Sequence, residues 1–223
     1  MIRSALLCAA LLLLPSQERD AHQIAARLES RYQHARTLKA AFLQSYRDGK
    51  GAPSAESGTV YFSRPGRMRW EYESPETKLF LVDGVNVWFY VPADHTASRA
   101  KLHDSSDWRT PLALLAGKAD LSKLCGSLEV AGSATPPSVA GDTVLQCIPR
   151  QSSASESIRE VLFETDPDAF LARIVVREAG NAVTEFRFAR WEQNVVVPEV
   201  KFHFEPPPGV AVVDEQSLAG QLR

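Results

Sequence analysis

The sequence lacks an excess of positive charge. Its 25 Lys and Arg residues stand against 27 Asp and Glu, a formal net charge of -2. No basic surplus is available to neutralise phosphates, so the composition argues against a nucleic-acid partner. Histidine is also scarce, and its spacing matches no recognised metal-ligand pattern. We therefore expect no metal site among the five histidines, which are His22, His34, His95, His103 and His203.

Short catalytic motifs are missing as well. The chain contains no Gly-x-Ser-x-Gly, no P-loop and no dinucleotide fingerprint. No Ser or Asp stands beside a histidine in a recognised catalytic pattern. We therefore expect a protein that is not an enzyme and that needs no cofactor. An enzyme that hydrolyses a lipid ester ranks last among the alternatives.

The long hydrophobic run of the chain is confined to its first residues. A positive start, Met1–Arg3, precedes the uninterrupted apolar run Ala5–Leu14, which ends at Pro15-Ser16. This run is too short to cross a bilayer as a helix and is typical of a secretory signal peptide. We predict a signal peptide over residues 1–16, with an approximate cleavage site, and a single domain over 17–223. A buried N-terminal helix is the alternative.

Cysteine is rare, with three residues. Cys8 falls in the predicted signal peptide, which leaves Cys125 and Cys147. An even pair in an exported chain favours a disulfide, which would stabilise the fold by about 3 kcal/mol. Two buried thiols remain the alternative. Without a Cys-x-x-Cys or a nearby histidine cluster, nothing points to a redox or metal role.

Short strands dominate the rest of the sequence. An amphipathic helix is predicted over 20–37, a weakly alternating segment over 38–46 and a turn or open loop over 48–58. Eleven further segments have strand character: Thr59–Arg64, Met68–Tyr72, Lys78–Val82, Asn86–Val91, Ser98–Leu102, Ser127–Val130, Thr143–Ile148, Ile158–Glu164, Leu171–Arg177, Val183–Arg190 and Glu199–Phe204. A sheet of roughly eleven or twelve strands must curl, which creates a concave face.

Three local signals refine this pattern. Asp83-Gly84 between two strand-like runs is a strong hairpin signal. Thr110–Gly117 has a helix cap, a proline at the first helical position and a glycine stop, so it predicts a short apolar helix. Gly132–Gly141, rich in Pro and Ser, predicts a loop between the two cysteines. The apolar helix and the concave face together are suited to an acyl chain, which needs a dry surface and no reactive group.

Six stretches, taken in order, resemble the outer-membrane lipoprotein carrier protein (LolA) family. They are Phe42-Leu-Gln44, Gly58-Thr-Val-Tyr-Phe-Ser-Arg-Pro-Gly-Arg-Met-Arg-Trp-Glu-Tyr72, Val82-Asp-Gly84, Val87-Trp-Phe-Tyr90, Thr110-Pro-Leu112 and Phe202-His-Phe-Glu-Pro-Pro-Pro-Gly-Val210. The resemblance covers nearly all of the chain after the leader. It implies a mainly β fold, an unclosed antiparallel β-barrel of about eleven strands with helices lidding its concave apolar face.

The resemblance also implies a function and a set of partners. Proteins of this family accept acylated lipoproteins from an ATP-driven transporter in the inner membrane. They carry them across the periplasm to an outer-membrane acceptor lipoprotein, LolB. We expect a monomer in the periplasm. The alternatives are a periplasmic shuttle for another lipid, a lipid- or lipoprotein-sensing module of the same fold, and a structural module whose cavity its own side chains fill.

Residue roles follow from the same resemblance. Arg64 matches the arginine that holds the lid closed in this family, and we term it the lid latch. A guanidinium suits that role because it offers several donors in a fixed fork. Met68 stands where the family often has Phe. The acyl-chain cavity is expected to include Phe62, Met68, Trp70, Tyr72, Trp88, Leu112 and Leu115.

Overall fold

A computed structural model describes residues 16–48, 50, 53–102, 115, 117, 120–150 and 157–214, so most of the predicted signal peptide lies outside the described residues. The α-helices are α1 (Ser16–His34) and α3 (Leu121–Leu124), and the short 3-10 helices are η1 (Pro92–Asp94), η2 (Ala179–Asn181) and η3 (Glu199–Phe202). The strands are β1 (Thr37–Arg47), β2 (Ser54–Ser63), β3 (Arg67–Ser74), β4 (Lys78–Val82), β5 (Asn86–Val91), β6 (Thr96–Lys101), β7 (Cys125–Val130), β8 (Thr143–Pro149), β9 (Ile158–Thr165), β10 (Leu171–Glu178), β11 (Val183–Gln193) and β12 (Ala211–Asp214).

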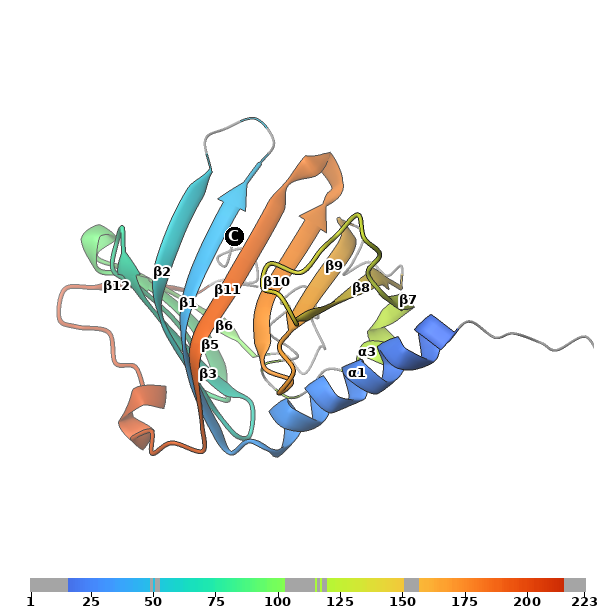
Figure 1. Cartoon of the computed structure of the whole chain (residues 1–223). Helices are drawn as coiled ribbons and strands as arrows, with labels where there is room; N and C mark the ends of the chain where they lie inside the picture. Colours follow the sequence, from blue (N-terminus) through green and yellow to red (C-terminus); the bar gives the residue numbers. More distant parts are fainter. Residues whose placement is uncertain are drawn as a thin grey trace, which may run out of the picture.

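All of these strands form one 12-stranded sheet in the order β12-β6-β5-β4-β3-β2-β1-β11-β10-β9-β8-β7. Neighbours pair antiparallel, except that β12 pairs parallel with β6. Strand β1 lies at the centre, between β2 and β11, and joins the two halves of the chain. The sheet curls, and α1 crosses one end of it (Figure 1). Because the order ends at β12 and β7, the barrel is unclosed, which confirms the predicted fold class.

Alternation along the strands creates two distinct faces. On β3, Met68, Trp70 and Tyr72 are buried and the residues between them are partly exposed, because successive side chains of a strand point to opposite faces. These three residues belong to one large hydrophobic cluster that also contains Leu28 and Tyr32 of α1. We call the face of the sheet that carries this cluster the inner face, and the opposite one the outer face.

The segment after β11 covers part of the outer face. Phe202 and Phe204 pack there against Leu79, Leu81 and Trp88. Residues 199–204, predicted as a strand, instead contain the 3-10 helix η3, so that prediction is wrong. The alternating aromatic residues bury their rings against the sheet rather than pair with a neighbouring strand.

The N-terminal hairpin is longer than its sequence indicates. Residues 48–58 are predicted as a turn or loop, yet β2 begins at Ser54, which pairs with Tyr46 of β1. A bulge in the pairing with β3 lies between Ser57 and Gly58. A Cβ at position 58 would overlap the carbonyl of Glu71, so the glycine permits a close approach of two strands rather than a loop.

Three other segments can be compared with their predictions. The first helix ends at His34 rather than at residue 37, because Thr37 already pairs with Ser63 as part of β1. Gly132–Gly141 is a loop, as predicted. The internal helix predicted over 110–117 lies largely outside the described residues, within which Leu115 is helical and Gly117 is in a turn.

Candidate functional site

The inner face is apolar over most of the sheet. Its floor is an aromatic cluster around Trp70, whose ring is 0% exposed. Four phenylalanine rings surround it with centroid distances of 4.7 to 6.3 Å, and they are Phe42, Phe62, Phe186 and Phe188. Edge-to-face contacts of this kind stabilise a core beyond the area that it buries. The cluster unites side chains from β1, β2, β3 and β11.

The buried polar groups on this surface include the Tyr72–Gln44 pair and the indole N–H of Trp70. The Tyr72 hydroxyl donates a hydrogen bond of 2.8 Å to Oε1 of Gln44, and both side chains are buried. Burial raises the pKa of Tyr72, so the phenol stays protonated. The other group is the indole N–H of Trp70, which is buried and has no hydrogen-bond partner within the described residues.

Helix α1 covers the inner face with one apolar stripe. Ala21, Ala25, Leu28 and Tyr32 are all buried, and their spacing of three or four residues places them on one side of the helix. The Tyr32 hydroxyl accepts a hydrogen bond of 2.9 Å from the backbone N–H of Leu171. The side chain of Tyr32 therefore ties the end of α1 to β10.

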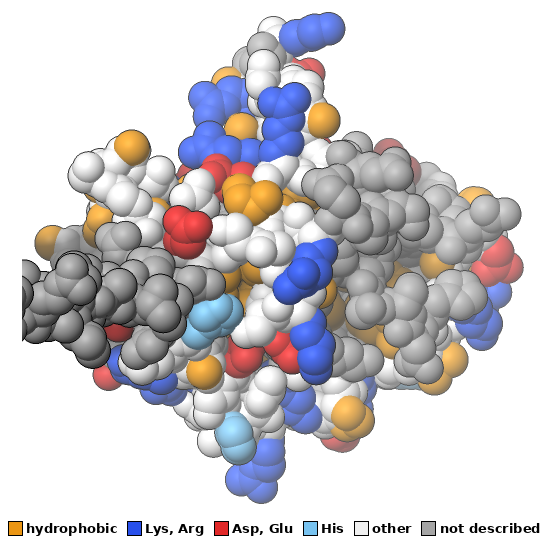
Figure 2. Space-filling model, turned by 90° about the vertical axis from the view of Figure 1, so that its right-hand side faces the viewer, with side chains coloured by type: hydrophobic (Ala, Val, Ile, Leu, Met, Phe, Trp, Pro, Cys, Tyr) orange, Lys and Arg blue, Asp and Glu red, His pale blue; other side chains and the backbone are white. Residues whose placement is uncertain are grey.

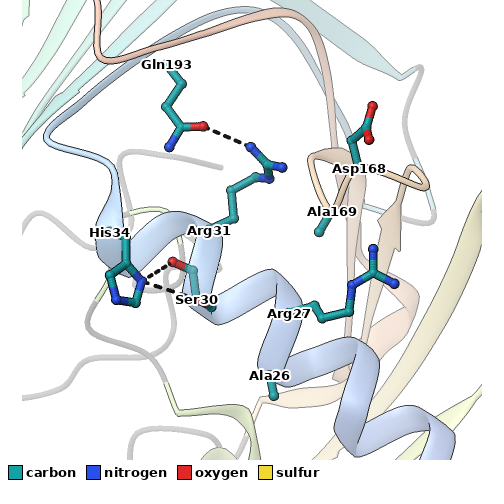
Figure 3. A pocket seen from close by; sticks show the side chains of 8 residues that line it. All are labelled: Ala26, Arg27, Ser30, Arg31, His34, Asp168, Ala169 and Gln193. Atoms are coloured by element: carbon teal, nitrogen blue, oxygen red, sulfur yellow. Dashed lines mark hydrogen bonds between the residues drawn. The ribbon is translucent and has the colours of Figure 1, made fainter.

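The exposed side of α1 forms an open groove with the sheet, of about 590 Å³. Figure 3 shows Arg27 and Arg31 of α1 opposite the turn that carries Asp168, with Gln193 above them. Arg27 donates to the carbonyl of Pro167 at 2.9 Å and Arg31 donates to Gln193 at 2.8 Å. The Arg31 guanidinium also lies 4.1 Å from the centre of the Phe170 ring. The contacts that line this groove therefore hold the exposed side of α1 to the sheet.

Arg64 lies in the turn between β2 and β3 and reaches two helical segments. Its Nε donates to the carbonyl of Ala35, and its Nη2 donates to the carbonyls of Tyr32 and Leu115. The last carbonyls of a helix have no partner within the helix, and a cation there also interacts favourably with the helix dipole. Burial lowers the pKa of Arg64, a cost that these carbonyl contacts offset.

Gly117 completes this contact. Its φ is +65°, a left-handed conformation that glycine favours just after a helix end. A Cβ at this position would overlap the guanidinium of Arg64. Leu115, two residues earlier, is 0% exposed and belongs to the inner-face cluster. Leu115 therefore sits over the inner face, and Gly117 lies against the latch.

A second junction holds α1 to α3. The Glu29 carboxylate accepts a hydrogen bond of 2.5 Å from the backbone N–H of Leu121, and Asp120 caps the same short helix. Burial raises the pKa of Glu29, with Asp120 adding to the effect. Immediately after α3, Cys125 and Cys147 form a disulfide with a Cα–Cα distance of 5.4 Å. The disulfide links β7, at the edge of the sheet, to β8.

The outer face differs in chemistry from the inner one. Several charged side chains on β9–β11 form ion pairs, such as Arg173 with Glu164 and Arg177 with Glu160. On the side that Figure 2 presents, basic and acidic side chains lie beside one another with hydrophobic side chains between them.

Within the described residues, no cluster of three His, Cys, Asp or Glu could hold a metal ion, and no helix is long and apolar enough to cross a membrane.

The structure brings together most of the residues expected to line the cavity. Those on the inner face are Phe62, Met68, Trp70, Tyr72 and Leu115. Leu112 lies outside the described residues. Trp88 was expected with them, but that placement is wrong. It packs on the outer face with Phe202, and its indole N–H donates to Asp83.

Other residues of the site carried no clear sequence signal. Phe42, Phe186 and Phe188 complete the aromatic floor. The last two alternate with charged or small residues in Glu185–Arg190, which is consistent with their shared face. Gly117 was recognised only as a helix stop. Its contact with Arg64 depends on a separation of 53 positions in sequence, which no local pattern reveals.

Residues 33–205 match the model of the family described as outer membrane lipoprotein carrier protein LolA. The chain belongs to this family. A protein of Nitrosospira multiformis named outer-membrane lipoprotein carrier protein is 32% identical over 192 residues, 84% of this chain and 87% of the relative. A protein of the same name from Nitrosomonas europaea is 34% identical over 161 residues, 70% of this chain and 72% of the relative.

Solved structures agree on the fold. An uncharacterized conserved protein from Thermus thermophilus matches with a TM-score of 0.55 and 14% identity, over 88% of this chain and 99% of that one. At this identity the likeness concerns the fold alone. The range matched by the LolA family includes Arg64, the aromatic floor and η3, and it ends before β12.

Proposed function

We propose that this chain is a periplasmic carrier that binds the acyl chains of lipoproteins released from the inner membrane and delivers them to an outer-membrane acceptor. The observation that carries the proposal is the apolar inner face, covered by α1 and Leu115 and held by Arg64. Membership of the LolA family supports it, since the relatives are named outer-membrane lipoprotein carrier proteins.

The energy of transfer explains why a covered apolar face is needed. Each buried methylene group contributes about 0.8 kcal/mol, so one long acyl chain gains on the order of 10 kcal/mol when it leaves water. Acyl chains free in the periplasm would aggregate or return to the first membrane. Within this proposal the chains contact Phe62, Met68, Trp70 and Tyr72, together with Leu112 and Leu115 of the cover.

The cover also keeps binding reversible. In the closed state without cargo, Arg64 donates to the carbonyls of Tyr32, Ala35 and Leu115, and the apolar side chains of the cover pack on the inner face. Cargo must displace these contacts, so their free energy is subtracted from the affinity. A carrier held closed by weak polar bonds therefore shields its cargo and still releases it to an acceptor.

The contacts of the helix α1 indicate which part of the cover moves. On its inner side Tyr32 bonds to Leu171, and on its outer side Arg27 and Arg31 bond to the turn before β10 and to β11. The hydrogen bonds from Arg64 to Leu115 and to Ala35 are equally long, 3.3 Å, so the additional contacts of α1 with the sheet distinguish the two. We expect opening to separate Leu115 from Arg64 while α1 stays on the sheet.

The partners and the chemistry follow from the same proposal. An ATP-driven transporter of the inner membrane would supply the cargo, and a LolB-like acceptor lipoprotein would receive it. The carrier forms and breaks no covalent bond in this cycle, so it acts as a chaperone rather than as an enzyme. Export through the predicted signal peptide places it in the periplasm.

The test is to identify what travels with the protein. We would isolate the exported chain gently from its own periplasm and analyse it by intact mass spectrometry. Acylated lipoproteins in amounts equimolar with the carrier are expected. Free lipids alone would transfer the function to a shuttle for another lipid, and a chain without apolar cargo would contradict the proposal.

A further inference from the structure

The indole N–H of Trp70 is an unpaired donor in the floor of the inner face. The side chain is 0% exposed, and Nε1 has no hydrogen-bond partner in the part of the chain that the structure describes. The other tryptophans with described side chains differ. Trp88 donates to Asp83 at 3.1 Å and Trp191 donates to the carbonyl of Leu171 at 2.7 Å.

Two arginines share this property only in part. Arg31 and Arg67 each have a buried Nε without a partner among the described residues. However, each guanidinium makes hydrogen bonds through its other nitrogens. An indole has one donor only. Of these three buried donors in the described part of the chain, Trp70 Nε1 alone belongs to a side chain whose entire hydrogen-bonding capacity is unused.

The neighbours of Trp70 offer it no side-chain acceptor. Its partners across the sheet are Val60 on β2 and Phe80 on β4. The surrounding rings are those of phenylalanines, with Phe42 nearest at 4.7 Å. An N–H···π contact with such a ring is much weaker than a bond to a carbonyl oxygen. A phenylalanine at position 70 would keep this site apolar without an unpaired polar group, so the donor of Trp70 is costly unless a ligand uses it.

The chemistry of the site selects the acceptor. An acyl chain consists of hydrocarbon, but it ends in an ester or amide carbonyl, which is a strong and neutral acceptor. A carboxylate or phosphate would bring a charge into an apolar surface that carries the neutral Tyr72–Gln44 pair. A buried charge needs a partner of opposite charge, whereas a neutral carbonyl needs one donor.

We infer that Trp70 Nε1 donates a hydrogen bond to the ester or amide carbonyl of a bound acyl group. The inner face then recognises the acyl linkage and not the hydrocarbon alone, and Trp70 sets the depth to which the chain enters. This inference rests on the proposed function, because cargo reaches Trp70 only when the cover over the inner face opens. In the closed, empty carrier the indole N–H of Trp70 has no acceptor. A bound acyl group supplies one.

The test compares two lipids that differ in the carbonyl. Phosphatidylglycerol with two ester-linked palmitoyl chains and its dialkyl ether counterpart would each displace a fluorescent acyl probe from the exported chain. We expect the ester lipid to bind about 5-fold more tightly, because a net hydrogen bond contributes about 1 kcal/mol. Trp70→Phe should remove that preference. Trp88→Phe, on the outer face, should retain it.

A second measurement applies even if Trp70→Phe fails to fold. In the unsubstituted chain, the indole N–H resonance of Trp70 should move downfield with the ester lipid and not with the ether lipid. Equal binding of both lipids, with no selective shift, would overturn the inference and leave the carrier proposal intact. Failure of both lipids and of acylated peptides to bind would instead contradict the carrier proposal itself.

Discussion

The guanidinium of Arg64 occupies the space that a side chain at position 117 would need. Gly117 has a φ of +65° and lies directly against that group. Arg64 donates at the same time to the carbonyls of Tyr32 and Leu115. One cation thus joins the end of α1 to Leu115, and a glycine makes room for it.

Gly117→Ala is expected to open the cover. The methyl group displaces Arg64, so binding of an apolar dye to the empty chain should rise several-fold relative to the unsubstituted protein. The control is Gly180→Ala, since Gly180 also has a positive φ, +82°, but faces open space. Both changes cost about 1 kcal/mol of backbone strain. Equal dye binding by the two variants would show that Gly117 does not seat the latch.

Arg64→Leu is expected to load cargo but to release it poorly. Leucine cannot donate to the carbonyls, so the closed empty state loses the bonds that compete with cargo. The measurement is the transfer of a labelled lipoprotein from the carrier to membranes that contain the acceptor. Arg36→Leu, an exposed arginine beside the same turn, should transfer normally. Normal delivery by Arg64→Leu would refute the role of the latch.

Removal of the disulfide is expected to weaken the fold. Cys125 and Cys147 are 22 positions apart, and opening a loop of this size lowers the free energy of unfolding by about 3 kcal/mol. Urea denaturation of Cys125→Ala/Cys147→Ala measures this loss. A reductant should destabilise the unsubstituted chain to the same extent and leave the double variant unchanged. Two free thiols in the native exported protein would contradict the bond.

Glu164 makes the stability depend on pH. It is 1% exposed, bonds to Ser138 at 2.6 Å and pairs with Arg173 at 2.7 Å. Burial alone would raise its pKa, but these partners hold the pKa below its usual value. The carboxylate therefore contributes stability above its unfolded pKa of about 4.3, and that stability is lost as pH falls through the folded pKa.

The variant Glu164→Gln isolates this contribution. At pH 7 we expect the free energy of unfolding to fall by about 3 kcal/mol, and the difference from the unsubstituted chain to shrink below about pH 4. Glu185→Gln is the control, because Glu185 is 23% exposed, lies 3.9 Å from Arg173 and pairs with Arg187, which is 47% exposed, so its loss should stay under about 1 kcal/mol. A pH-independent difference would rule out the carboxylate as the cause.

Faces of strands were predictable where polar and apolar residues alternate. On β3, Arg69 and Glu71 alternate with Met68, Trp70 and Tyr72 and so identify the buried side. On β5 every residue from Val87 to Val91 is apolar, because both faces of the sheet are covered there. The sequence therefore could not place Trp88, and its true partner, the segment with Phe202, lies more than a hundred residues away.

The roles of Gly58 and of strand β12 could not be predicted from the sequence either. Gly58 belongs to a stretch, residues 48–58, whose composition is typical of a loop. Its role depends instead on the close approach of the Glu71 carbonyl on the neighbouring strand. Strand β12 is short, and it exists because β6 offers an open edge and Arg99 pairs with Asp214. Both features arise from contacts distant in sequence. The hairpin at Asp83 was predictable, because the aspartate bonds to the backbone N–H groups of Val85 and Asn86 just after it.

The central claim is that cargo acyl chains bind the inner face. The most direct measurement places the photo-cross-linking residue benzoylphenylalanine at position 68, on the inner face, or at position 88, on the outer face, of the full chain produced together with its cargo. We predict that irradiation joins acylated lipoproteins to the carrier from position 68 and not from position 88. Cross-linking from position 88 alone, or from neither position, would contradict the account.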